Sequence, residues 1–248
     1  MKRIQHLVMA GICCLLGITV LQGSGMKEHE AVTPVSRPGE KQLRHERFNE
    51  RVSKGNVDLV FIGDSITEGW EDEGKKVWKE FYGSRNAVNL GIGGDRTQHV
   101  IWRLDHGNLE GIKPKVAVIM IGTNNSGDNS PQEIADGITR IVHQIREKTS
   151  QTRILLLAIF PRGKDQADSR RQVNQKTNVL IQKLSDNKHV FYQDIGERFL
   201  TNNGELTLDI MPDLLHLSQK KHPMRSNKAV YPQHYHFLRA ADGYNQEI

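Results

Sequence analysis

The chain has 248 residues, of which 37% are hydrophobic and 25% are charged. This composition excludes an intrinsically disordered chain and a membrane-embedded helix bundle, and the length suits one large α/β domain. The formal net charge is +5, but the basic excess lies at the two ends and the body is close to neutral. A nucleic-acid partner is therefore not expected.

The first residues are typical of a secretory signal. Lys2 and Arg3 precede an uncharged apolar run over 7–21, and small residues follow at 23–25. The run is short for a membrane span, which needs about 20 residues. We expect residues 1–25 to be a signal peptide and the protein to be exported to the periplasm or the extracellular space. An uncleaved N-terminal membrane anchor is the alternative.

Residues 26–55 are polar and predict a linker that leads into a short helix at 41–52. From residue 57 onward, short apolar runs alternate with stretches that have apolar residues at helical spacing. Strands are predicted at 57–62, 87–90, 116–121, 153–159 and 189–192. Helices are predicted at 75–82, 97–104 and 169–184, with a further helix that begins at Ser130-Pro131. This alternation predicts parallel strands in a three-layer α/β/α sandwich.

Glycine and polar residues follow the first three predicted strands, at 63–65, 93–95 and 122–124. Parallel α/β sheets place their chemistry at the carboxyl ends of the strands. Three segments that are distant in sequence should therefore meet at one edge of the sheet, which predicts an active site there.

Ser65 is the candidate nucleophile, because a glycine-containing turn exposes its hydroxyl and the next helix offers free backbone N–H groups. The alternative is that Ser65 only caps that helix. His216 is the candidate base. Asp213 precedes it by three residues and can orient the imidazole, since residues three apart share one side of a helical turn. The alternative is an incidental pair on a solvated loop.

Gly94 and Asn124 are candidate donors to an oxyanion, together with the Ser65 N–H. The alternatives are that Gly94 serves a turn with positive φ and that Asn124 is a capping or turn side chain. No metal and no cofactor are expected. Both cysteines, Cys13 and Cys14, lie in the predicted signal, no metal-ligand spacing is present, and the glycines match neither nucleotide-binding pattern.

The motifs of the chain resemble those of the SGNH (GDSL-type) hydrolases, in particular the branch of the platelet-activating factor acetylhydrolase catalytic subunits. They run in order from about residue 57 to 218 and read GDSITEGW (63–70), NLGIGGDRT (89–97), WRL (102–104), IGTNN (121–125), FPRG (160–163) and DLLHLS (213–218). The resemblance implies a hydrolase domain over 56–218 with a mainly parallel, flavodoxin-like sheet and no metal or organic cofactor.

The same resemblance implies Ser65 as nucleophile, Asp213 and His216 as its partners, and Ser65, Gly94 and Asn124 as oxyanion donors. It implies short acyl esters, acetyl above all, as substrates, either lipids or acetylated glycans. Asn125 stands where many members of the wider family have Asp, and this Asn-Asn form fits the acetylhydrolase-like branch.

The chain departs from its relatives after Ser218. They usually continue into Gly-Tyr and a closing amphipathic helix, whereas residues 219–248 here have little helical periodicity. We expect this divergent tail to be foreign to the fold, as a frameshift would make it. Two alternatives to a serine esterase of short-chain acyl esters stay open: an O-acetylesterase of carbohydrate or wall polymer, and a catalytically impaired binding or vestigial protein.

Overall fold

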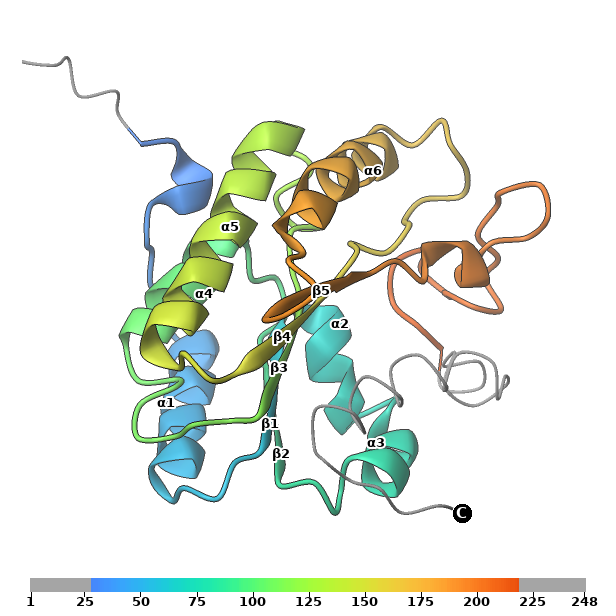
Figure 1. Ribbon diagram of the computed structural model, residues 1–248. Coiled ribbons are helices and arrows are strands. Elements are labelled where there is room, and N and C mark those ends of the chain that lie inside the picture. Colours follow the sequence, from blue (N-terminus) through green and yellow to red (C-terminus); the bar gives the residue numbers. More distant parts are fainter. Residues whose placement is uncertain (1–27, 219–248) are drawn as a thin grey trace, which may run out of the picture.

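The computed structural model describes residues 28–218. The predicted signal peptide at 1–25 and the divergent tail at 219–248 therefore lie outside the described residues. Five parallel strands form one sheet in the order β2-β1-β3-β4-β5, which is the flavodoxin-like order (Figure 1). The strands are β1 (Leu59–Gly63), β2 (Ala87–Gly91), β3 (Val116–Met120), β4 (Arg153–Leu157) and β5 (Val190–Gln193). The predicted fold class is confirmed.

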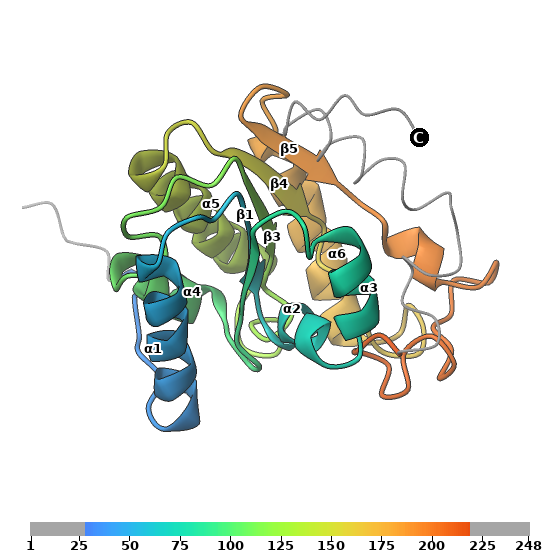
Figure 2. The same cartoon turned by 90° about the horizontal axis from the view of Figure 1, so that it is seen from below.

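Helices cover both faces of the sheet. Figure 2 shows α1, α4 and α5 on one side of the strands and α2 and α3 on the other. The α-helices are α1 (Glu40–Ser53), α2 (Ser65–Glu68), α3 (Lys75–Phe81), α4 (Thr97–Asp105), α5 (Pro131–Lys148) and α6 (Ser169–Ile181). Short 3-10 helices lie at Glu30–Val32, Gly69–Glu71, Gln182–Leu184 and Gly196–Phe199. As predicted, Ser130 caps α5 through the Glu133 N–H, with Pro131 in the first turn.

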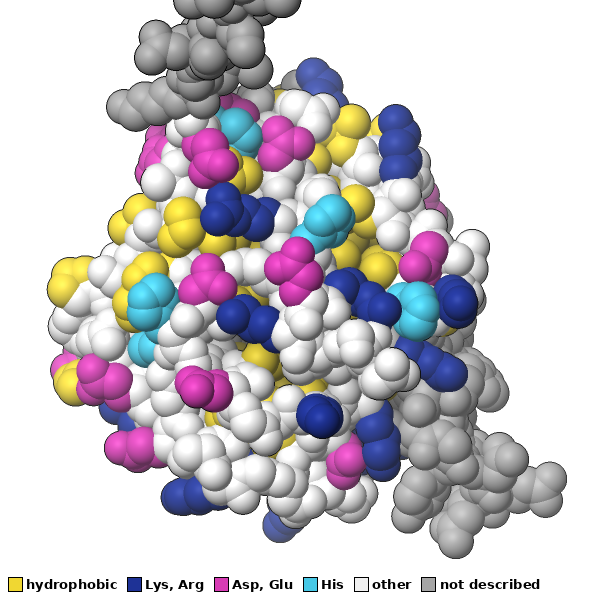
Figure 3. Space-filling model, turned by 60° about the vertical axis from the view of Figure 1, so that its left-hand side comes forward, with side chains coloured by type: hydrophobic (Ala, Val, Ile, Leu, Met, Phe, Trp, Pro, Cys, Tyr) yellow, Lys and Arg dark blue, Asp and Glu magenta, His cyan; other side chains and the backbone are white. Residues whose placement is uncertain are grey.

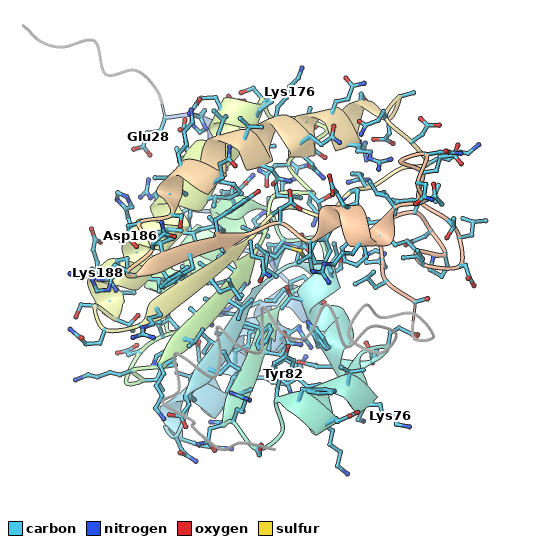
Figure 4. The ribbon with its side chains drawn as sticks, turned by 45° about the vertical axis from the view of Figure 1, so that its right-hand side comes forward. Glu28, Lys76, Tyr82, Lys176, Asp186 and Lys188 are labelled. Carbon is cyan, nitrogen blue, oxygen red and sulfur yellow. The ribbon has the colours of Figure 1, made fainter. Side chains whose placement is uncertain are left out.

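The sheet separates two hydrophobic clusters. The larger joins the strands to α1, α4, α5 and α6 and is built mainly from isoleucine, leucine and valine. The smaller is aromatic: Phe61 of β1 contacts Trp78 and Tyr82, with both pairs of ring centroids 4.9 Å apart. Figure 4 shows Tyr82 lying toward the body of the protein, whereas Lys76 on α3 points away from it. Each such ring pair stabilises the fold by about 0.5–1.5 kcal/mol beyond simple burial.

The segment before α1 differs from the predicted linker. Ala31 and Val32 are buried, and the Thr97 hydroxyl donates a hydrogen bond of 2.7 Å to the Ala31 carbonyl. Gly137 of α5 gives this segment room, because a Cβ there would lie 2.7 Å from the same carbonyl oxygen. Polar contacts add to this attachment, since Gln98 of α4 donates to Glu30 at 3.0 Å and Arg140 of α5 donates to the Val32 carbonyl at 3.1 Å. The segment before the helix therefore packs against α4 and α5.

Helix α6 lies within the helix predicted at 169–184, and its most buried side chains include polar ones. Ile181 is 1% exposed, and Arg171 and Asn174 are at most 1% exposed as well. Arg171 donates to the Gly204 carbonyl at 2.9 Å, and Asn174 donates to the Thr123 hydroxyl at 3.2 Å. The amino-terminal half of α6 lies over strand-end loops, where backbone groups need polar partners, and hydrophobic spacing alone could not indicate this.

The exposed surface of the helices is polar and mixed in sign. On the face drawn in Figure 3, basic and acidic side chains are interspersed and neither sign gathers into a large patch. Ion pairs such as Lys148–Asp105, at 3.2 Å, belong to this pattern. Between residues 28 and 218 no helix has both the length and the apolar character that crossing a bilayer requires.

Candidate active site

Ser65 is the first residue of α2, directly after β1. The cap of this helix is Asp64, whose Oδ1 accepts the Ile66 N–H at 3.0 Å, so Ser65 itself does not cap and its side chain is partly exposed. Gly63 makes this turn possible. A Cβ at Gly63 would lie 2.1 Å from the Thr67 hydroxyl and 2.4 Å from the Met120 carbonyl, which only glycine avoids.

The structure brings Ser65, His216 and Asp213 into one chain of contacts. Nε2 of His216 lies 2.7 Å from Ser65 Oγ, and Nδ1 lies 2.5 Å from Asp213 Oδ2. An ionised Asp213 can only accept, so Nδ1 carries the proton and Nε2 is the acceptor of the serine hydroxyl. This is the geometry that general-base activation of a serine requires.

Asp213 is held in its ionised form by hydrogen bonds. Burial raises its pKa, but the backbone N–H and ring of His216 and the backbone N–H of Leu215 outweigh burial, so the pKa lies below its ordinary value. The backbone bonds to Oδ1 measure 2.7 Å from His216 and 3.0 Å from Leu215. The carboxylate is therefore available to stabilise a protonated imidazole.

The loop that carries this pair is anchored at several points. Leu214 adopts a φ of 58°, a left-handed conformation that costs a non-glycine residue about 1–2 kcal/mol. Its carbonyl accepts the Gly163 N–H at 2.9 Å, which ties the loop to the segment after β4. Farther along, the Ser218 N–H donates to the Ile210 carbonyl and its hydroxyl to the Asp209 carbonyl, both at 2.9 Å.

Gly94 and Asn124 follow β2 and β3, the two strands that flank β1. In register, Gly63 lies opposite Gly91 and Met120, so the three loops begin at one edge of the sheet. Gly94 has a φ of 76°, and its N–H has no hydrogen bond to any of residues 28–218. Nδ2 of Asn124 donates one hydrogen to the Asp95 carbonyl at 2.9 Å, which orients the amide and leaves its second hydrogen for a ligand.

Three further residues lie at this edge and were not predicted as site residues; Glu68 and Arg162 belong to motifs of the resemblance, whereas Arg37 lies outside them. Arg37, from the segment before α1, donates to the loop after β2, and Glu68 accepts the Gly93 N–H in the same loop. Arg162 donates to the Thr123 carbonyl at 3.0 Å, on the opposite side of the site. Burial lowers the pKa of Arg162, and the neighbouring Arg170 adds to this effect. Among the described residues no group of three or more His, Cys, Asp or Glu side chains could hold a metal.

Comparison with known proteins agrees with this geometry. Residues 61–222 match the model of the GDSL-like lipase/acylhydrolase family. The chain is 38% identical over 176 residues to platelet-activating factor acetylhydrolase IB subunit alpha2 of Rattus norvegicus, covering 71% of this chain and 75% of that protein. It is 34% identical over 189 residues to subunit alpha1 of Homo sapiens, covering 76% and 80%.

Solved structures share the fold at lower identity. A GDSL-like lipase from Bacteroides thetaiotaomicron matches with a TM-score of 0.57 and 17% identity, over 80% of this chain and 97% of that one. An acetylxylan esterase from Geobacillus stearothermophilus matches with a TM-score of 0.56 and 18% identity, over 75% and 94%. At such identities the likeness concerns the arrangement of strands and helices.

Proposed function

Because the chain belongs to the GDSL-like lipase/acylhydrolase family and is a carboxylic ester hydrolase, we propose that it cleaves short-chain acyl esters, acetyl esters above all, through an acyl-enzyme on Ser65. The observation that carries the proposal is the unbroken series of contacts from Asp213 through His216 to Ser65 Oγ. The acetyl preference is supported by the curated relatives, which are named as acetylhydrolase subunits.

In the first step Ser65 Oγ attacks the ester carbonyl carbon while its proton passes to Nε2 of His216. The carbonyl oxygen becomes an oxyanion, which the N–H groups of Ser65 and Gly94 and the Asn124 amide stabilise. Collapse of this intermediate breaks the bond to the leaving alcohol, which takes the proton from His216. A water molecule then attacks the acyl-serine with His216 as base again, which releases the acid and restores Ser65.

Pre-steady-state hydrolysis of p-nitrophenyl acetate tests the proposal. We expect a burst of p-nitrophenol equal to the enzyme concentration, and no burst from Ser65→Ala, which removes the nucleophile. The matched control is Ser84→Ala, since Ser84 is exposed on the turn before β2 and should keep the burst. A folded wild-type protein no faster than Ser65→Ala would refute the esterase and favour a binding or vestigial protein.

The leaving group is a separate question that a substrate panel addresses. Acetylated sugars and acetylated phospholipids carry the same acyl group on different alcohols, so the ratio of their kcat/KM values separates a glycan esterase from a lipid esterase.

We also propose that the protein is exported, on the support of Lys2, Arg3 and the apolar run over 7–21. Fractionation of producing cells, with N-terminal sequencing of the product, tests this.

A further inference from the structure

Arg37 connects the segment before α1 to the loop that follows β2. Its Nη1 donates to the Gly93 carbonyl at 2.8 Å and to Asp95 Oδ1 at 3.1 Å. The side chain is 28% exposed, whereas Asp95 is 1% exposed and is also paired with Arg103 at 2.8 Å. The Arg37 guanidinium is thus held by the buried Asp95 carboxylate, which also pairs with Arg103.

The carbonyl that Arg37 binds belongs to the same peptide group as the Gly94 N–H. This group is planar and trans, so its C=O and N–H point in opposite directions. A donor that fixes the Gly93 oxygen therefore also fixes the direction of the Gly94 N–H. Because the donor is cationic, it draws electron density toward the carbonyl oxygen and makes the N–H at the other end a stronger donor.

The neighbouring peptide groups of this loop are held as well. Glu68, one turn after the candidate nucleophile, accepts the Gly93 N–H, and Arg44 pairs with Glu68 at 3.6 Å. Arg44 also donates to the Gly91 carbonyl at 2.8 Å. The peptide groups before Gly93–Gly94 are thus hydrogen bonded, and Arg37 restrains rotation of the Gly93–Gly94 peptide itself through its carbonyl.

The missing side chain of Gly94 leaves room for the Arg37 guanidinium. At a φ of 76° a Cβ atom there would lie 3.3 Å from Arg37 Nη1 and 3.4 Å from Nη2, so the guanidinium covers the side of Gly94 where a side chain would project. Its N–H makes no hydrogen bond within residues 28–218. One face of the peptide is therefore occupied by Arg37, and the N–H is free for a ligand.

We propose that Arg37 is a positioning residue that aims and polarises the Gly94 N–H toward the oxyanion. The inference rests on the proposed function, in which Gly94 is an oxyanion donor. It makes the segment before α1 a functional part of the site. Arg37 contacts neither the substrate nor the reacting atoms in this role; it acts through the peptide group.

The decisive variant is Arg37→Met, which keeps much of the apolar stem and removes every donor. Complete removal of an oxyanion donor costs about 10²–10³ in kcat, so loss of its orientation should cost about 10- to 100-fold, with KM for p-nitrophenyl acetate nearly unchanged. Inactivation by a fluorophosphonate, whose phosphoryl oxygen occupies the oxyanion position, should slow in parallel. Arg37→Lys should recover part of both rates, because an ammonium can still donate to the Gly93 carbonyl.

Arg47→Met is the control, since the side chain of Arg47 is exposed on α1. It should match wild type. If Arg37→Met lowers the melting temperature, Arg37→Ala is assayed instead, with and without added methylguanidinium. Recovery of kcat when methylguanidinium is added supports the positioning role of Arg37. The inference is overturned if wild type is active and Arg37→Met stays within about twofold of Arg47→Met in kcat and in inactivation rate. An inactive wild type would instead overturn the proposed function.

Discussion

Asp64 is the group whose protonation should leave the clearest mark on the stability of the fold. Its side chain is fully buried beside Ser65, and its Oδ2 has no hydrogen-bond partner among the described residues. Burial first, and then the nearby charge of Asp95, raises the pKa of Asp64 from 3.8 to about 7. Asp64→Asn removes this ionisation and keeps an oxygen to accept the Ile66 N–H.

The unfolded chain loses the Asp64 proton at a lower pH than the folded protein does. As pH rises from 3.8 to about 7, unfolding therefore releases a proton and the free energy of unfolding falls. This contribution to stability is fully present below the unfolded pKa and is lost once the pH has passed the folded pKa. At about 1.4 kcal/mol per pH unit, the interval corresponds to roughly 4 kcal/mol.

Urea denaturation at a series of pH values from about 4 to about 8.5 measures this difference directly. Relative to wild type, Asp64→Asn should gain up to roughly 4 kcal/mol between the two ends, because all other titrating groups are shared and cancel. Asp72→Asn is the control, since it makes the same substitution at an exposed aspartate. A difference for Asp64→Asn that is independent of pH would refute the reasoning.

Two further substitutions test the contacts around the site. Asp213→Asn should lower kcat for p-nitrophenyl acetate on the order of 10⁴-fold, because an amide does not stabilise the protonated His216. Its melting temperature should stay close to that of wild type, since Asp213 is 54% exposed, and a loss in kcat below tenfold or so would contradict the role. Asn125→Asp should destabilise the fold by about 2–5 kcal/mol, because the Asn125 amide donates to Thr97, Gln98 and Asn129 and a carboxylate would face those oxygens without a proton. Urea denaturation measures this loss, and a change under about 0.5 kcal/mol would show that the network reorganises.

The sheet and most helices could be predicted because their apolar spacing is strong. The run at 116–121 gave β3 within one residue, and the Ser130-Pro131 signal placed the start of α5. The edge of the sheet at which polar segments meet also followed from topology alone. The sequence indicated Asp213 and His216 as a pair, and the structure places them beside Ser65; their catalytic roles stay predictions.

Contacts that depend on tertiary structure could not be predicted. Arg37 lies in a polar stretch without periodicity, and nothing in sequence links it to a glycine 56 positions away. Burial of Arg171 on α6 is similarly invisible, because a charged residue on a helix is normally exposed and only the backbone carbonyls of another loop make it favourable. Hydrophobic spacing locates helices and strands, whereas the hydrogen-bond partners of polar side chains depend on which loops meet in the folded protein.

The order of the site residues along the chain sets the order in which they become available during synthesis. Ser65, Gly94 and Asn124 emerge from the ribosome early, directly after the three adjacent strands β1, β2 and β3, whereas His216 follows 151 positions after Ser65. Because synthesis proceeds from the N-terminus at about 5–20 residues per second, a nascent chain carries its nucleophile for roughly 8–30 seconds before it has a base. A product that ends before His216 would keep the sheet-edge half of the site and lack the means to deprotonate Ser65.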